Sequence, residues 1–273
     1  MFGVEDLEHI EAYLASGMAV EAMPCAEAAV AEMETYIDEN CAVSDEVQYF
    51  SFSSQFEKLT YARVEGDPRK LVAAPAPFDR AYADYAYCLI AQHDMEAGRE
   101  ALKQAVRWNP MDCAHRLDLA AVMANQGDID EYLALSYSVF ARASRASSLV
   151  RAYLNFAGYF EEQDLCDAAA ACVYAALRLS PLDARAAAFA DRLAKERGRD
   201  PRAMDAAAAA HLLDEQGIPE GANVEVVISA LLLAQIAEER GDADTRDEMV
   251  RVAAELVGRE TAASLMRAIR EQD

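Results

Sequence analysis

EALKQAVRWNPMD, residues 100–112, has a counterpart later in the chain in ACVYAALRLSPLD, residues 171–183. Both stretches contain the pattern Ala-x-Arg-x-x-Pro-x-Asp. This pattern is typical of a helix that ends at a proline, because proline cannot continue a helix and restricts the residue before it. The shared residues are Ala105, Arg107, Pro110 and Asp112 in the first copy and Ala176, Arg178, Pro181 and Asp183 in the second. The chain therefore repeats one helix ending, which indicates an internal repeat.

The match continues upstream of the two prolines. At the same offset, the large residue Tyr82 corresponds to Tyr153 and the small residue Ala86 corresponds to Ala157. Two antiparallel helices pack closely when small side chains let the backbones approach and large ones fill the space between them. The composition agrees, since helix-forming Ala, Leu, Glu and Arg are abundant while the chain has only 11 Gly and 8 Pro. We therefore predict an all-α protein of antiparallel helix hairpins, with an ordinary helical bundle as the alternative arrangement.

The repeated positions resemble the signature of the tetratricopeptide repeat (TPR), which has aromatic, small, small, Ala and Pro positions in that order. They fall on Tyr82, Ala86, Gly98, Ala105 and Pro110, and again on Tyr153, Ala157, Ala169, Ala176 and Pro181. A weaker copy between them, residues 113–143, keeps Leu119, Ala120 and the turn at Gly127 but has Tyr132 where a small residue is expected. The resemblance implies a right-handed superhelical TPR-like solenoid of helix hairpins with N- and C-terminal helical extensions.

Helical patterns also flank the repeats. Apolar residues recur at helical spacing near the N-terminus, at Val4, Leu7, Ile10 and Leu14 and again at Val30, Met33 and Ile37. Residues 184–198 have the length of a helix that covers the last repeat. Residues 230–258 resemble a fourth, divergent hairpin, with Ala234 and Ala253 at the small positions.

These patterns divide the chain into four predicted segments. They are an N-terminal helical segment (1–64), a proline-containing linker (65–79), three TPR-like repeats with a covering helix (80–198), and C-terminal helices that include the divergent hairpin (199–273). Residues 47–56 fit either an extended segment or a helix, and Ser53 or Ser54 is suited to cap a helix that follows.

The arrangement also resembles a group of bacterial TPR proteins of uncharacterised function. The matching stretches are YFSF, APAPF, ALKQAVRWNP and QGIPEG, and the resemblance as a whole covers roughly residues 49–258. This resemblance implies the fold and no particular activity.

The chain is strongly acidic, with a formal net charge of −23 and no Lys or Arg among residues 1–50. Such a surface repels nucleic-acid phosphates and anionic lipids, so we expect neither nucleic acid nor a membrane as partner. The start of the chain is acidic and amphipathic, unlike a secretory signal, and the longest apolar stretch (226–237) is too short to span a bilayer. We therefore expect a cytoplasmic protein with reduced cysteines.

No catalytic or cofactor motif is found in the sequence. The glycines are dispersed, so no phosphate-binding loop is present, and the four histidines lie far apart. Cys113 with His115, and Cys88 with His93, could each supply two metal ligands, whereas a structural zinc site needs four. We predict no catalytic residue, no cofactor and no metal site, and hence a protein that is not an enzyme.

The remaining function is binding. The first helix of each hairpin in a TPR-like solenoid lines a concave groove. The helical phase places the following residues there: Arg80, Asp84, Tyr87, Asp118, Asn125, Arg151, Asn155 and Glu162. We predict a scaffold or adaptor that binds a protein or peptide in this groove, with Tyr87 and the Arg151–Asn155 pair as its main contacts.

The charges in the predicted groove favour one class of peptide. Some TPR domains clamp the free carboxylate of an acidic tail with Lys and Asn residues. At the matching positions this chain has Ala83, Tyr87, Asp118, Arg151 and Asn155, of which only Arg151 is a cation. We therefore expect the groove to reject acidic tails and to accept a neutral or basic segment stacked against Tyr87.

Two alternatives stay open. The groove could be filled by the protein's own termini or by a second copy of the chain. The protein could instead be an enzyme or a small-molecule-sensing regulator with a pocket between the repeats and the terminal helices.

Overall fold

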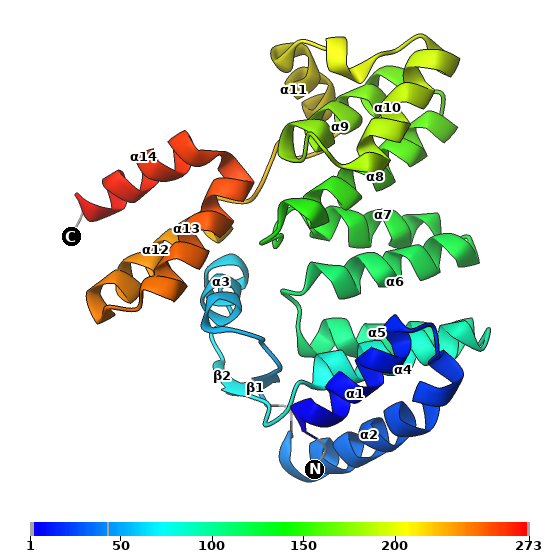
Figure 1. Ribbon diagram of the computed structural model, residues 1–273, viewed down its shortest axis with the longest axis vertical. Helices are drawn as coiled ribbons and strands as arrows, with labels where there is room; N and C mark the ends of the chain where they lie inside the picture. Colours follow the sequence, from blue (N-terminus) through cyan, green and yellow to red (C-terminus); the bar gives the residue numbers. More distant parts are fainter. Residues whose placement is uncertain (1–2, 43, 272–273) are drawn as a thin grey trace. The chain divides into compact units, whose positions relative to one another are not determined.

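The computed structural model describes residues 3–42 and 44–271, and most of these residues are helical (Figure 1). They form 14 α-helices, one short 3-10 helix and two short strands. The prediction of an all-α fold is therefore confirmed. The chain divides into two compact units, Met1–Ile129 and Asp130–Asp273, which are called unit 1 and unit 2 below.

Unit 1 contains two N-terminal helices and the first repeat. Its longer helices are α1 (Val4–Ala15), α2 (Ala19–Asn40), α4 (Phe78–Ala91), α5 (Met95–Trp108) and α6 (Cys113–Gln126). Four of the apolar residues that predicted α1 and α2 are buried (Leu7, Ile10, Val30 and Met33), Leu14 and Ile37 are half-buried, and Val4 is exposed. Leu7, Ile10 and Met33 belong to the same core as Phe78 and Trp108. The N-terminal helices thus pack against the first hairpin, α4–α5.

A small parallel sheet lies beside this core. Strand β1 (Val47–Phe50) pairs with β2 (Lys70–Ala73), and helix α3 (Gln55–Glu65) connects them. The ambiguous segment is therefore extended at first and helical afterwards, with the Ser54 hydroxyl accepting a hydrogen bond from the Glu57 amide at the start of α3. The predicted linker contains β2, a strand that the sequence analysis did not expect.

Unit 2 contains the third repeat, its covering helix and a C-terminal hairpin. Its elements are α7 (Ile129–Ser138, with its first residue in unit 1), α8 (Ala146–Glu162), α9 (Cys166–Leu179), α10 (Ala184–Arg197), the 3-10 helix η1 (Pro201–Ala203), α11 (Ala206–Glu215), α12 (Val224–Arg240), α13 (Ala243–Val257) and α14 (Arg259–Arg270). Helices α8 and α9 form one hairpin, and α12 and α13 form another. The small residues predicted at the hairpin contacts, including Ala157, Ala176, Ala234 and Ala253, are fully buried.

The structure of the weaker repeat differs from the other hairpins in the part where its sequence departs from the repeat signature. Its second helix, α7, ends at Ser138, and α8 begins only at Ala146. Tyr132, which occupies a position expected to be small, donates a hydrogen bond of 3.2 Å from its hydroxyl to the backbone oxygen of Asn155. The large side chain therefore links α7 to α8.

None of the helices that the described residues form is long and apolar enough to cross a membrane.

Candidate functional site

Two of the predicted groove residues of unit 1 lie against the N-terminal helix α1. The Arg80 guanidinium forms an ion pair with Glu11 of α1, with 2.6 Å between Nη2 and Oε1. Asp84, one turn further along α4, is only 6% exposed. Helix α1 packs beside α4 here, so these two residues lie next to the protein's own N-terminal helix.

Further along the same face, an aromatic residue stays open to solvent. Tyr87 on α4 is 39% exposed, and its hydroxyl donates a hydrogen bond to the carboxylate of Asp118 on α6. Asn125, at the end of α6, is exposed, and its amide donates to the backbone oxygen of Ala121 in its own helix. Of the five predicted residues in unit 1, Tyr87 and Asp118 are the two that contact each other at the surface.

The three predicted residues of unit 2 lie on α8. The Asn155 amide donates a hydrogen bond of 2.9 Å to the hydroxyl of Ser136 on α7. Burial raises the pKa of Tyr132 to about 12, the charge of Glu162 adds to the increase, and Arg151 opposes it. All three predicted residues therefore lie near Tyr132, which the sequence did not place among the groove residues.

Unit 1 also contains a buried polar cluster that the sequence analysis did not predict. Asp79, in the first turn of α4, and Asn109, after the end of α5, are 2% and 0% exposed. The Asn109 amide donates to Asp79 Oδ2 at 3.1 Å and to Glu57 Oε2 at 3.0 Å. The Nε2 atom of His115 lies 3.5 Å from Asp79 Oδ2 and 3.7 Å from Oδ2 of Asp112, the residue that caps α6.

The surroundings shift the pKa values of several of these groups. Burial alone would lower the pKa of His115, but the contact with Asp79 and the charge of Asp112 raise it above its ordinary value. Burial raises the pKa of Asp84 to about 7, Glu11 adds to the increase, and Arg80 opposes it. Desolvation likewise raises the pKa of Glu57.

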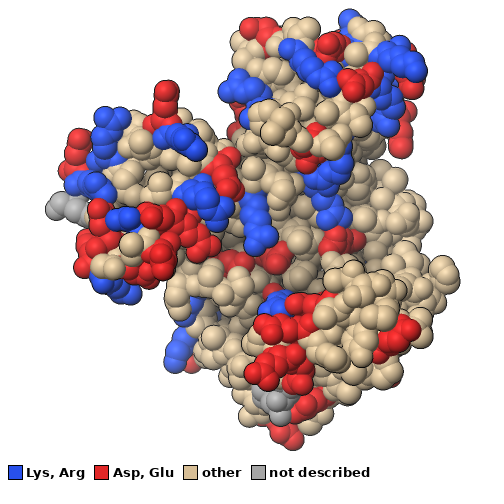
Figure 2. Space-filling model, in the orientation of Figure 1, with Lys and Arg blue, Asp and Glu red and all other residues tan. Residues whose placement is uncertain are grey.

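In Figure 2, acidic side chains (red) gather on the lower part of the face shown, where α1 lies in Figure 1.

One sequence signal for this cluster was available. Asp112 and His115 stand three residues apart at the start of a helix, which places them on one face. Nothing in the sequence joins them to Asp79 or Asn109, because these residues come from another helix and from a helix end.

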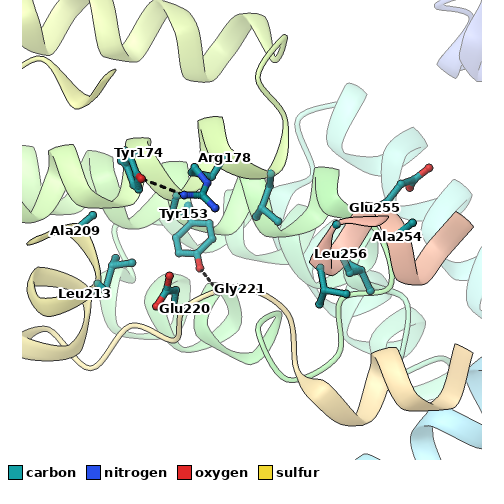
Figure 3. Close-up of a pocket in the computed structure, with 15 residues that line it drawn as sticks. Tyr153, Tyr174, Arg178, Ala209, Leu213, Glu220, Gly221, Ala254, Glu255 and Leu256 are labelled. Carbon is teal, nitrogen blue, oxygen red and sulfur yellow. Dashed lines mark hydrogen bonds between the residues drawn. The ribbon is translucent and has the colours of Figure 1, made fainter. Parts of the chain in front are cut away.

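Unit 2 contains a pocket of about 390 Å³ (Figure 3). Its lining residues are Tyr153, Tyr174, Ala175, Arg178, Leu179, Ala209, Ala210, Leu213, Glu220, Gly221 and residues 254–258. Figure 3 shows Tyr174 and Arg178 on one side of Tyr153 and the side chains of Leu213 and Glu220 on the other. The Arg178 guanidinium donates a hydrogen bond of 3.2 Å to the Tyr174 hydroxyl. The wall thus combines two tyrosines, a cation and carboxylates with apolar side chains.

Both surfaces have features of binding sites. The Tyr87–Asp118 pair places an aromatic ring beside a carboxylate, and the pocket of unit 2 places aromatic and charged groups around an apolar wall.

The chain matches no known protein-family model, and no curated protein has a matching sequence.

Proposed function

We propose that the protein is a non-enzymatic cytoplasmic scaffold that binds a neutral or basic peptide segment of a partner protein at Tyr87 and Asp118. We further propose that its hairpins are TPR-like and belong to a right-handed superhelical solenoid. The burial of the signature positions supports this second point, since Ala86, Ala105, Ala157 and Ala176 are all 0% exposed. Small residues at these positions let the two helices of a hairpin approach closely.

The observation that carries the proposed function is the exposed Tyr87 ring with its hydroxyl bound to Asp118. A large ring that is already held in place loses little conformational freedom when a ligand covers it. Tyrosine is also among the residues that contribute most to binding at protein interfaces. The carboxylate of Asp118 adds a negative charge beside the ring, which attracts a Lys or Arg side chain of the ligand.

The charge of unit 1 favours the same class of ligand. Residues 1–129 contain 23 Asp and Glu against 9 Lys and Arg. A field of this sign accelerates the approach of a basic segment and repels an acidic one.

Peptide titrations can test this proposal. Three short peptides of equal length would carry the same apolar residues with Lys, Gln or Glu between them, and fluorescence anisotropy would measure their affinity. We expect the Lys and Gln peptides to bind and Tyr87→Ala to weaken both by about tenfold, which corresponds to 1.4 kcal/mol. Tyr137→Ala is the matched control, because Tyr137 is 48% exposed and lies on α7. Equal losses in the two variants, or preferential binding of the Glu peptide, would contradict the proposal.

The pocket of unit 2 favours a second candidate, a regulator that senses a small molecule. A pocket of about 390 Å³ falls within the size range of ligand sites, roughly 300–1,000 Å³. Ala210→Trp would place a large ring in the pocket from the half-buried position 210 of α11. A metabolite that raises the melting temperature of the unmodified protein but not that of Ala210→Trp would support this candidate. A metabolite library that leaves both temperatures unchanged would count against it.

A further inference from the structure

Three potential metal ligands meet in the buried cluster of unit 1. One side-chain ligand atom each from Asp79, Asp112 and His115 lies within 4.8 Å of the other two. We propose that these residues bind a single divalent transition-metal ion, for which Zn²⁺ is the best fit. This site is distinct from the peptide surface at Tyr87.

The hydrogen bonds of the cluster favour a bound cation. His115 is 7% exposed. Its Nδ1 atom has no hydrogen-bond partner among the described residues, and its Nε2 atom has only the 3.5 Å contact with Asp79 Oδ2, which is too long and poorly aligned for a hydrogen bond. Asp79 is 2% exposed, and its Oδ1 atom also lacks a partner within the described part of the chain. Buried polar side-chain atoms nearly always have a partner in folded proteins, which can be protein, water or an ion. Of these three atoms, His115 Nε2 faces the carboxylates of Asp79 and Asp112, which points to a cation held between them.

The distances between the ligand atoms also suit a Zn²⁺ ion. A Zn²⁺ ion bound by nitrogen and oxygen at about 2.0–2.2 Å places neighbouring ligand atoms of a tetrahedron about 3.4 Å apart. His115 Nε2 lies 3.5 Å from Asp79 Oδ2 and 3.7 Å from Asp112 Oδ2. Three protein ligands with a water molecule in the fourth position are a common zinc arrangement.

Neighbouring groups already orient the carboxylates. Asn109 donates to Asp79 Oδ2 at 3.1 Å, and the amide of Ala114 donates to Asp112 Oδ1 at 2.7 Å. Because Oδ1 of Asp112 accepts the bond from Ala114, Oδ2 is the oxygen that would bind the metal ion beside His115. Such outer contacts are typical of metal sites, where they fix the direction of each ligand.

The charge of the cluster and the types of its ligand atoms favour a transition-metal cation. Buried carboxylates are costly unless a cation compensates them, and Asp79 lies near Asp84, which is also buried. One imidazole with two carboxylates suits a transition metal, since Mg²⁺ and Ca²⁺ prefer oxygen ligands alone.

Calorimetric titration of the chelator-treated full-length protein with Zn²⁺ tests the site. We expect one strong site per chain. Asp112→Asn should weaken Zn²⁺ binding by about tenfold or more. Mutating a residue that only hydrogen-bonds to a metal ligand already lowers metal affinity by about 10- to 100-fold. This variant keeps the helix cap, because Asn caps a helix as well as Asp does. His115→Gln should remove the strong site, and circular dichroism would show that both variants are folded.

The chain is acidic, so the control must separate this site from weak surface binding. His211→Gln serves this purpose, because His211 is 72% exposed on its side chain and lies 3.4 Å from Glu215 on the same helix. We expect this variant to bind Zn²⁺ as the unmodified protein does. Co²⁺ should give the intense visible absorption of a tetrahedral site, and His115→Gln should lose it. Weak binding of several ions, or a strong site that survives both Asp112→Asn and His115→Gln, would overturn the proposal.

Discussion

The hydroxyl of Tyr153 donates a hydrogen bond of 2.8 Å to the backbone oxygen of Pro219. The same hydroxyl accepts a bond of 2.7 Å from the amide of Gly221. Tyr153 lies on α8 and is 0% exposed, while Pro219 and Gly221 lie between α11 and α12. One side chain of the third repeat thus fixes the segment that leads into the C-terminal hairpin.

Removing this hydroxyl should destabilise unit 2. Tyr153→Phe keeps the ring but leaves the amide of Gly221 and the oxygen of Pro219 without this partner. We expect the free energy of unfolding to fall by about 1–3 kcal/mol, the usual cost of a buried polar group that loses its partner. Urea unfolding followed by circular dichroism measures this change. Tyr174→Phe is the control, because the Tyr174 hydroxyl bonds to the exposed Arg178 and its loss should matter little. Equal effects of the two substitutions would refute this role of Tyr153.

Replacing Gly98 or Gly158, which both lie inside helices, with alanine should change the stability of the protein in opposite directions. An alanine methyl group at position 98 would lie 2.6 Å from Cγ1 of Ile90, whereas at position 158 it would contact nothing within 4 Å. Gly158→Ala should stabilise the protein by about 0.5–1 kcal/mol, since alanine favours the helix. Gly98→Ala should destabilise it by about 1–3 kcal/mol, because the hairpin α4–α5 becomes overpacked.

The fluorescence of Trp108, the single tryptophan, reports the unfolding of unit 1 for the position 98 variant. The double variant Gly98→Ala with Ile90→Ala tests the cause, since the shorter side chain at position 90 removes the clash. The cost of Gly98→Ala should then decrease in a double-mutant cycle. An unchanged cost would mean that Ile90 is not responsible.

The Asp67 carboxylate should make stability depend on pH. Its hydrogen bonds to Arg69 hold the pKa of Asp67 well below its usual range, with 2.6 Å between Arg69 Nη2 and Asp67 Oδ2. A lowered pKa in the folded state stabilises the fold above the unfolded pKa, about 4, and this contribution is lost as the pH falls below it. Arg69 also donates to Gln48 of β1, so the pair supports the small sheet.

Melting temperatures of the unmodified protein and of Asp67→Asn should therefore differ most at neutral pH. The difference should shrink between about pH 5 and pH 2 as Asp67 takes up a proton. Asp45→Asn changes an exposed aspartate and should show no comparable trend. A difference that stays constant over this range would show that the charge of Asp67 does not contribute.

The helices of this protein could be predicted because their signals are local. Ser54 marks the start of α3, Pro110 and Pro181 follow the ends of α5 and α9, and Gly241 adopts the left-handed conformation, with a φ of 73°, that ends α12. Strand β2 could not be predicted in the same way. It lies in a segment with three prolines, and it forms only because β1, on the far side of α3, supplies its partner.

The candidate sites, too, could be predicted only where their signals are local. Tyr87 and Asp118, which helical phase assigns to one face, contact each other, since they lie on the neighbouring helices α4 and α6. That they line a binding groove stays a prediction. Helical phase did not show that Arg80 and Asp84 lie against α1, because the packing of a distant helix has no local signal. Buried polar residues such as Asp79 and Asn109 look like surface residues in a sequence. The division of the chain into four segments stays a prediction.

The most direct test of the peptide-binding proposal is a reversal of charge at position 118. Asp118 is half-buried beside the exposed Tyr87, so Asp118→Lys replaces an attractive charge for basic peptides with a repulsive one. Calorimetry with the Lys and Glu peptides would compare this variant with the unmodified protein, and Tyr87→Phe would control for the lost hydrogen bond. We predict that the unmodified protein and Tyr87→Phe prefer the Lys peptide, and that Asp118→Lys loses this preference by about tenfold or more, which corresponds to at least 1.4 kcal/mol. An unchanged preference in Asp118→Lys, or tight binding of the Glu peptide by the unmodified protein, would contradict the proposed function.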